Sequence, residues 1–148
     1  RAVRARRCGR LGSRAVIVLD THIWVGYIDD PASLPKPAID AIRGREEPVG
    51  ISSISVWEVF MLEQRGRLVL RIPARVWVEK CERLALFHFL PVDNTIARIA
   101  VELPPPLHAD PADRIIIATA LSLGATLVTR DRKIIDYPHV KTLRLSPP

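Results

Sequence analysis

The sequence has few of the residues on which several common kinds of site depend. It holds two cysteines, Cys8 and Cys81, which cannot form a disulfide framework. Neither cysteine belongs to a CxxC pair or has a histidine at ligand spacing, so we do not expect a zinc site. Its seven glycines form neither GxGxxG nor GxxxxGK(S/T), which excludes the glycine-rich loops that cradle nucleotide phosphates.

Long hydrophobic runs are missing as well. No apolar stretch approaches the roughly 18 residues of a membrane span, and no signal-peptide core follows the first residues. We therefore expect a soluble, cytoplasmic protein with no membrane partner. The length of 148 residues and the hydrophobic content of 48% suit one globular domain with a sizeable core.

The net charge of +6 comes entirely from the first residues of the chain. Residues 1–14 hold six arginines and no acid, and removing these six from the 22 basic residues leaves 16, which equals the number of acidic residues. Such an arm could bind phosphates, or it could be a disordered extension outside the fold. We predict a basic arm at 1–14, most simply an extension, followed by one folded domain at 15–148.

Short apolar runs alternate with amphipathic segments along the rest of the chain. The amphipathic segments carry apolar residues at helical spacing and end at glycine or proline. Alternating strands and helices predict an α/β fold with a mostly parallel sheet covered by helices on both faces. The predicted strands are 15–20, 48–52, 87–92, 125–129 and 140–145, and the predicted helices are 21–30, 37–44, 54–66, 73–85, 94–103 and 111–124.

Four acidic residues are expected at the edge where the parallel strands end. Asp20 closes the first strand, and Glu58 lies in the first turn of the helix that follows the second. Asp113 lies in the first turn of the helix entered at Asp110, and Asp131 follows the strand at 125–129. Because sites in such sheets lie beyond the carboxyl ends of the strands, these four carboxylates are expected to converge.

Each acid also has a purely structural explanation. Asp20 could cap the following helix, and Asp131 could be a turn residue. Ser55 and Glu58 match a capping box, and Asp110 and Asp113 have the same form, with Asp110 as the cap. Taken together the four favour a site, because capping does not require acids at nearly every strand exit.

Clustered carboxylates without histidine or cysteine indicate a hard divalent cation, Mg²⁺ or Mn²⁺. Such an ion relieves the repulsion among the acids and typically acts on phosphodiesters, so a nuclease is predicted, though not uniquely. Thr21, Ser53 and Thr129 could orient the carboxylates or waters. Arg114 and Arg130 could hold substrate phosphates, with solvated helix charges as the alternative. We predict no organic cofactor, and no role for His108.

Four segments of the chain, taken in order, resemble the successive motifs of PIN-domain proteins, most closely those of VapC-type toxins from bacterial toxin–antitoxin pairs. These segments are "VLDTHIWVGYI", "ISSISVWEVFMLEQRGRL", "HADPADRIIIATALSLGATLVTRD" and "YPHVKTL", which together cover roughly residues 16–145. The resemblance implies a three-layer α/β/α fold and an Mg²⁺- or Mn²⁺-dependent endoribonuclease with catalytic acids at Asp20, Glu58, Asp113 and Asp131. It further implies a homodimer, an RNA substrate, and a cognate antitoxin whose peptide crosses and silences the active-site groove.

Two other functions fit parts of the sequence. One is a catalytically silent PIN domain that binds RNA or a protein partner, which the presence of all four acids argues against. The other is a receiver-like signalling domain with an acidic Mg²⁺ pocket. That class needs an adjacent acidic pair after the first strand, but Thr21 and His22 follow Asp20 here.

Overall fold

The structure is a computed structural model that describes residues 16–145. Within that range four strands form one sheet, and every neighbouring pair of strands is parallel. The order across the sheet is β3-β2-β1-β4, and the strands are β1 (Ile17–Leu19), β2 (Val49–Ser52), β3 (Phe87–Leu90) and β4 (Thr126–Val128). The predicted parallel sheet is therefore confirmed, whereas the predicted arm at 1–14 lies outside the described residues.

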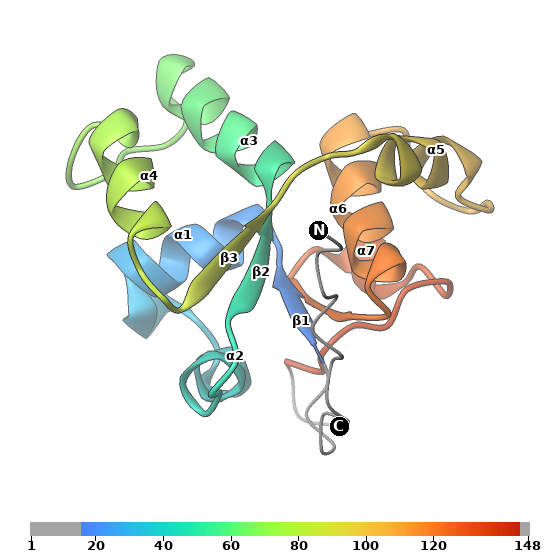
Figure 1. Cartoon of the computed structure of the whole chain (residues 1–148), viewed down its shortest axis with the longest axis horizontal. Coiled ribbons are helices and arrows are strands. Elements are labelled where there is room, and N and C mark those ends of the chain that lie inside the picture. Colours follow the sequence, from blue (N-terminus) through green and yellow to red (C-terminus); the bar gives the residue numbers. More distant parts are fainter. Residues whose placement is uncertain (1–15, 146–148) are drawn as a thin grey trace, which may run out of the picture.

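Helices cover both faces of the sheet, as predicted for a three-layer arrangement (Figure 1). The first face carries α1 (Thr21–Asp29), α2 (Lys36–Arg43) and α4 (Ala74–Glu82). The second face carries α5 (Asn94–Glu102), α6 (Pro111–Ser122) and α7 (Arg132–Ile135). Helix α3 (Ser53–Gln64) leaves the end of β2 and contacts α1, α4 and α6, and a 3-10 turn, η1 (Pro31–Ser33), follows α1. Across residues 16–145, no helix is long and apolar enough to cross a bilayer.

The side chains of β1 alternate between two hydrophobic cores. Ile17 and Leu19 enter the core under α1, α2 and α4, and Val18 enters the core under α6 and α7. The first core is centred on Trp24 of α1, which is fully buried and lies 4.8 Å, ring centre to ring centre, from Trp77 of α4. Because β1 is buried on both faces, its sequence is apolar at every position rather than alternating.

The prediction of a strand at 140–145 is wrong. The segment at 140–145 makes a single parallel bridge, between Thr142 and Leu127. The backbone N–H of Leu127 donates to Lys141 O, and the N–H of Leu143 donates back to Leu127 O. Strand β4 has only three residues, and its middle residue, Leu127, makes both of these bonds to the segment at 140–145. Helix α7, by contrast, was not predicted from the sequence, because four residues are too few to show a helical period.

Gly50 at the centre of the sheet marks a close approach between β2 and its neighbours. A Cβ atom there would lie 2.8 Å from Leu90 Cδ1 and 3.2 Å from Val18 Cγ2. We predict that Gly50→Ala lowers the free energy of unfolding by about 1–3 kcal/mol through overpacking. Denaturant titration would measure the loss. Because the two side chains clash, Gly50→Ala combined with Leu90→Ala should lose less than the sum of the single variants, and full additivity would contradict the assigned clash.

Candidate functional site

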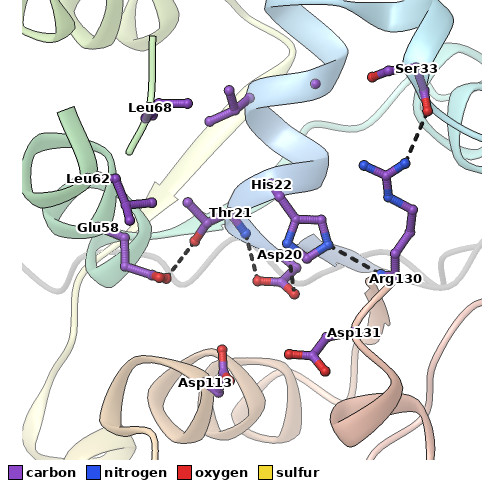
Figure 2. A pocket seen from close by; sticks show the side chains of 12 residues that line it. Asp20, Thr21, His22, Ser33, Glu58, Leu62, Leu68, Asp113, Arg130 and Asp131 are labelled. Carbon is purple, nitrogen blue, oxygen red and sulfur yellow. Dashed lines mark hydrogen bonds and ion pairs between the residues drawn. The ribbon is translucent and has the colours of Figure 1, made fainter. Parts of the chain in front are cut away.

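A cleft of about 370 Å³ opens at the carboxyl ends of the strands. All four of the acids singled out in the sequence line it, and they come from four different elements or their junctions (Figure 2). Figure 2 shows their carboxylates around one hollow, with Arg130 and His22 at its rim. The rest of the wall is formed by Thr21, Val25, Gly26, Ser33, Leu62 and Leu68. The convergence expected from strand order is thus present in the fold.

Asp20 is held more tightly than the other three acids. It is 3% exposed, and its Oδ1 accepts the N–H of Thr21 at 2.8 Å, so it caps α1. Its Oδ2 accepts the hydroxyl of Thr129 at 2.6 Å. The same Thr129 oxygen accepts the N–H of Asp131 at 3.0 Å, and this links the ends of β1 and β4. Thr129 therefore orients Asp20, as expected for a residue behind the carboxylates.

Glu58 is positioned by a short chain of hydroxyls. Its Oε1 lies 2.7 Å from Thr21 Oγ1, which lies 2.8 Å from Ser55 Oγ. A threonine hydroxyl has one hydrogen, so the consistent arrangement is donation from Ser55 to Thr21 and from Thr21 to Glu58. The capping-box alternative is wrong, because α3 begins at Ser53 and is capped by the Ser52 hydroxyl, which accepts from Ile54 N. Glu58 consequently lies in the second turn of α3, not in its first.

Asp113 forms a pair with a histidine to which the sequence assigned no role. The distance from Asp113 Oδ2 to His108 Nε2 is 2.6 Å, and both side chains are only about one-fifth exposed. The other ring nitrogen of His108 is buried and has no hydrogen-bond partner among the described residues. Asp110 accepts the N–H of Asp113 at 3.0 Å, so the prediction that Asp110 is the cap of this helix is confirmed.

Asp131 caps the short helix α7, where its Oδ1 accepts the N–H of Lys133 at 2.9 Å. Arg130 beside it donates from Nη1 to Ser33 O at 3.0 Å, which places its guanidinium at the cleft rim. His22 also lies at the rim, with Nδ1 3.6 Å from Asp20 Oδ2. That distance is too long for a hydrogen bond. The other ring nitrogen of His22, Nε2, accepts the backbone N–H of Arg130 at 3.4 Å.

Burial and mutual repulsion raise the pKa values of two of the acids, Glu58 and Asp113. The pKa of Glu58 is raised from 4.5 to about 7, chiefly by burial; the hydrogen bond from Thr21 opposes this rise, and the charges of Asp20, Asp113 and Asp110 contribute to it. Burial also raises the pKa of Asp113, with Asp110 and Asp20 adding to the shift and His108 opposing it. The cleft therefore concentrates more negative charge than the protein alone compensates.

The cleft has the donor chemistry of a hard cation site without being a closed metal cage. Among residues 16–145, no three acidic, histidine or cysteine side chains lie close enough together to hold one ion. Glu58, Asp113 and Asp131 each keep one carboxylate oxygen that accepts no hydrogen bond within this range. Such oxygens, facing a hollow with uncompensated negative charge, fit Mg²⁺ or Mn²⁺ better than zinc.

Three residues predicted to support the site do not line the cleft, and of these only Thr129 bonds directly to one of the four acids. Ser53 is the first residue of α3 and lies outside the lining set. Arg114 turns towards the end of α5, where its guanidinium donates to the carbonyl oxygens of Ala100, Val101 and His108 at 3.0, 3.3 and 3.5 Å. These carbonyls lie at or beyond the last turn of α5, so Arg114 joins α5 to α6 instead of facing a substrate.

Several known proteins are similar to this chain in sequence or in fold. The family model described as "PIN domain" matches residues 17–140. Ribonuclease VapC22 of Mycobacterium tuberculosis is 33% identical over 124 residues, which cover 83% of this chain and 92% of that protein. A toxin–antitoxin complex from Klebsiella pneumoniae contains a chain that is 22% identical, with a TM-score of 0.59 and coverage of 88% of this chain and 98% of that one. FitAcB from Neisseria gonorrhoeae is 23% identical, with a TM-score of 0.65 and coverage of 87% and 97%. The two solved structures share the fold.

The raised pKa of Glu58 predicts that this carboxyl destabilises the metal-free protein above neutral pH. Well below pH 4.5 it is neutral in both the folded and the unfolded chain, so it costs nothing. As the pH rises through 7 the folded chain ionises late, and the full penalty of about 2–3 kcal/mol is then present. Glu58→Gln should therefore raise the free energy of unfolding in EDTA at pH 8 and leave it nearly unchanged at pH 4.5.

Denaturant titration at the two pH values measures this difference. Glu79→Gln is the matched control, because Glu79 lies on α4 with its side chain 53% exposed. A gain for Glu58→Gln of the same size at both pH values would show that ionisation of Glu58 is not its cause.

The three carbonyl contacts of Arg114 predict a structural role. Arg114→Met should lower the free energy of unfolding by about 1–3 kcal/mol, because charged hydrogen bonds at the end of α5 are lost. Arg98→Met on α5 is the control, since Arg98 forms only an exposed pair with Glu102 and should cost about 0.5 kcal/mol or less. Urea unfolding compares the two, and equal losses would argue against Arg114 as the link between α5 and α6.

Proposed function

This chain belongs to the PIN domain family, and on that premise we propose that it is a metal-dependent endoribonuclease, the toxin of a type II toxin–antitoxin pair. The observation that carries the proposal is the cleft itself, where Asp20, Glu58, Asp113 and Asp131 face one hollow. The name of the relative in Mycobacterium tuberculosis, a ribonuclease, supports the reaction class. Membership of the family also removes the receiver-domain alternative.

We assign the binding of Mg²⁺ or Mn²⁺ to these four carboxylates. When bound, such an ion lowers the pKa of an attacking water and neutralises charge on the leaving oxygen of a phosphodiester. The free oxygens of Glu58, Asp113 and Asp131 are the candidate ligands, and Asp20 would add its charge from the floor of the cleft. Since no three of the described acids lie close enough together to hold one ion, waters would complete its coordination. The raised pKa of Glu58 supports the assignment, because a divalent cation removes the repulsion that contributes to it.

The surrounding residues of the chain orient these acids and receive the substrate. Thr129 and Thr21 hold one oxygen each of Asp20 and Glu58, which directs the remaining lone pairs towards the cleft. His108 holds Asp113 Oδ2 in the same way and leaves Oδ1 for the cation. Arg130 at the rim supplies a positive charge for an RNA phosphate.

We further propose that the protein forms a homodimer in the cytoplasm and that a cognate antitoxin covers the cleft. The Klebsiella pneumoniae structure of the same fold is a toxin–antitoxin complex, which supports an antitoxin as the partner. An antitoxin segment that reached the cleft would cover the carboxylates and keep RNA away from them.

The decisive experiment is cleavage of purified cellular RNA by the isolated protein with Mn²⁺ or Mg²⁺ and with EDTA. Asp113→Asn keeps the shape of the side chain and removes its charge, so cleavage should fall by about two orders of magnitude or more. The thermal stabilisation of the protein by Mn²⁺ should fall in parallel. Asp136→Asn is the matched control, because Asp136 is exposed and does not line the cleft.

The possible results separate the alternatives. Metal-dependent cuts at defined positions that Asp113→Asn loses and Asp136→Asn retains would establish the nuclease. Equal cutting by both variants would indicate a contaminating ribonuclease and contradict the proposal. Stabilisation by Mn²⁺ without any cutting would favour the catalytically silent PIN domain.

A further inference from the structure

A second hollow, of about 390 Å³, lies beside the acidic cleft, between α3 and the N-terminus of α6. We name it the Trp57 groove, after the exposed tryptophan on its wall. Its apolar lining comes from Ile54, Trp57 and Met61 of α3 together with Pro111 and Ala112 of α6. The helix N-terminus of α6 brings Asp110 to one side of the groove, and Arg65 stands where α3 ends.

The two hollows share a wall. Glu58 lines both the acidic cleft and the Trp57 groove, and Trp57 is its neighbour in the chain. Residues 54, 57, 58, 61 and 65 follow the helical spacing i, i+3, i+4, i+7 and i+11, so they form one continuous face of α3. A chain of nucleotides whose phosphate lies among the carboxylates would therefore have an adjacent base at this groove.

The exposure of Trp57 has no explanation in the packing of the fold. Its side chain is 54% exposed, whereas Trp24 and Trp77 are 0% and 3% exposed. A large aromatic side chain in water gives up the stabilisation that burial would bring. An accessible indole face beside a polar cleft is a suitable platform for an unpaired nucleobase, because unpaired bases stack on aromatic side chains.

The lining of the groove is charged as well as apolar, which disfavours a purely apolar protein segment as its occupant. Arg65 forms no ion pair with any residue in the described range 16–145, so its guanidinium is available to a phosphate. The carboxylates of Glu58 and Asp110 also line the wall, and a buried apolar interface would have to desolvate them. A hollow of this volume accommodates a small ligand such as one base with its sugar.

We propose that the Trp57 groove is a nucleobase subsite of the RNA-binding surface, in which an unpaired base next to the scissile phosphate stacks on the indole of Trp57. This inference rests on the proposed ribonuclease function and names the substrate as single-stranded RNA at this position. Stacking is tolerant of base identity, so the groove demands an unpaired base and not one particular base. Arg65 receives a phosphate at the end of the groove away from the acids.

Binding is tested first with the full-length Asp113→Asn variant, in which the proposed cleavage is largely lost, and a short single-stranded RNA oligonucleotide. Trp57 is the exposed tryptophan, so a stacked base should quench the protein's fluorescence. An oligonucleotide that carries a row of abasic sites should quench it much less. Trp57→Phe should bind the intact oligonucleotide with little quenching, because the ring remains while the fluorophore is lost.

Cleavage of a short single-stranded RNA then measures the energetic role. Trp57→Leu should lower kcat/KM mainly by raising KM, by about 5- to 150-fold for one stacked base. The stabilisation by Mn²⁺ should stay as in the wild type, because no carboxylate is changed. Phe60→Leu is the matched control: Phe60 is an aromatic residue on the same helix, 41% exposed and outside the groove lining, so its kcat/KM should not change.

Each result either supports or overturns the subsite. Wild-type kcat/KM in Trp57→Leu, or equal quenching by intact and abasic oligonucleotides, would overturn it while leaving the ribonuclease assignment standing. Unchanged RNA cleavage with an altered oligomeric state in light scattering would make the groove a protein interface instead. A wild-type protein that neither binds nor cuts RNA would overturn the proposed function and the subsite together.

Discussion

The parallel pairing of β1 with both β2 and β4 brings the ends of three strands to one edge, and the cleft depends on that pairing. Asp20 follows β1 directly, Glu58 lies on the helix that leaves β2, and Asp131 lies three residues after β4. Thr129 secures the geometry, because its hydroxyl donates to Asp20 and accepts from the backbone of Asp131. A slip of one residue in either strand pair would shift the strand ends relative to one another and so separate these side chains.

Bringing the four acids together costs free energy that the other contacts of the fold do not offset. Burial and neighbouring charge raise the pKa values of Glu58 and Asp113, so the protein without a cation carries unfavourable electrostatics near neutral pH. Trp57 is a second departure from what stability would favour, since a large apolar side chain is left in water. The two departures adjoin each other along α3. Sites that contradict simple folding rules in this way are where function is to be expected.

Capping and lining are not alternatives for the aspartates of this protein. Asp20 and Asp131 each cap a helix and also line the cleft, because a carboxylate has enough lone pairs to do both. Asp110 is a cap for α6 and lines the neighbouring groove only. The capping box expected at Glu58 fails because Ser52, at the end of β2, already caps α3. That left Glu58 free to bond with Thr21 across the cleft.

The sequence by itself determined the class of the fold and the four acids that gather. Apolar runs, helix-ending residues and the acids that follow each strand can be recognised locally in the sequence. In a parallel sheet the ends of all strands meet at one edge, so residues that follow the strands come together there. Only the tertiary structure decided which neighbouring side chains hydrogen-bond to the acids or hold them in place. His108 and Ser55 reach Asp113 and Thr21 only through packing, and Arg114, although adjacent to Asp113 in the chain, is rotated towards α5 by the helix. The continuity of the Trp57 groove with the cleft likewise comes from the contact of α3 with α6. Such distant contacts depend on how helices pack against one another, which no local pattern of residues encodes.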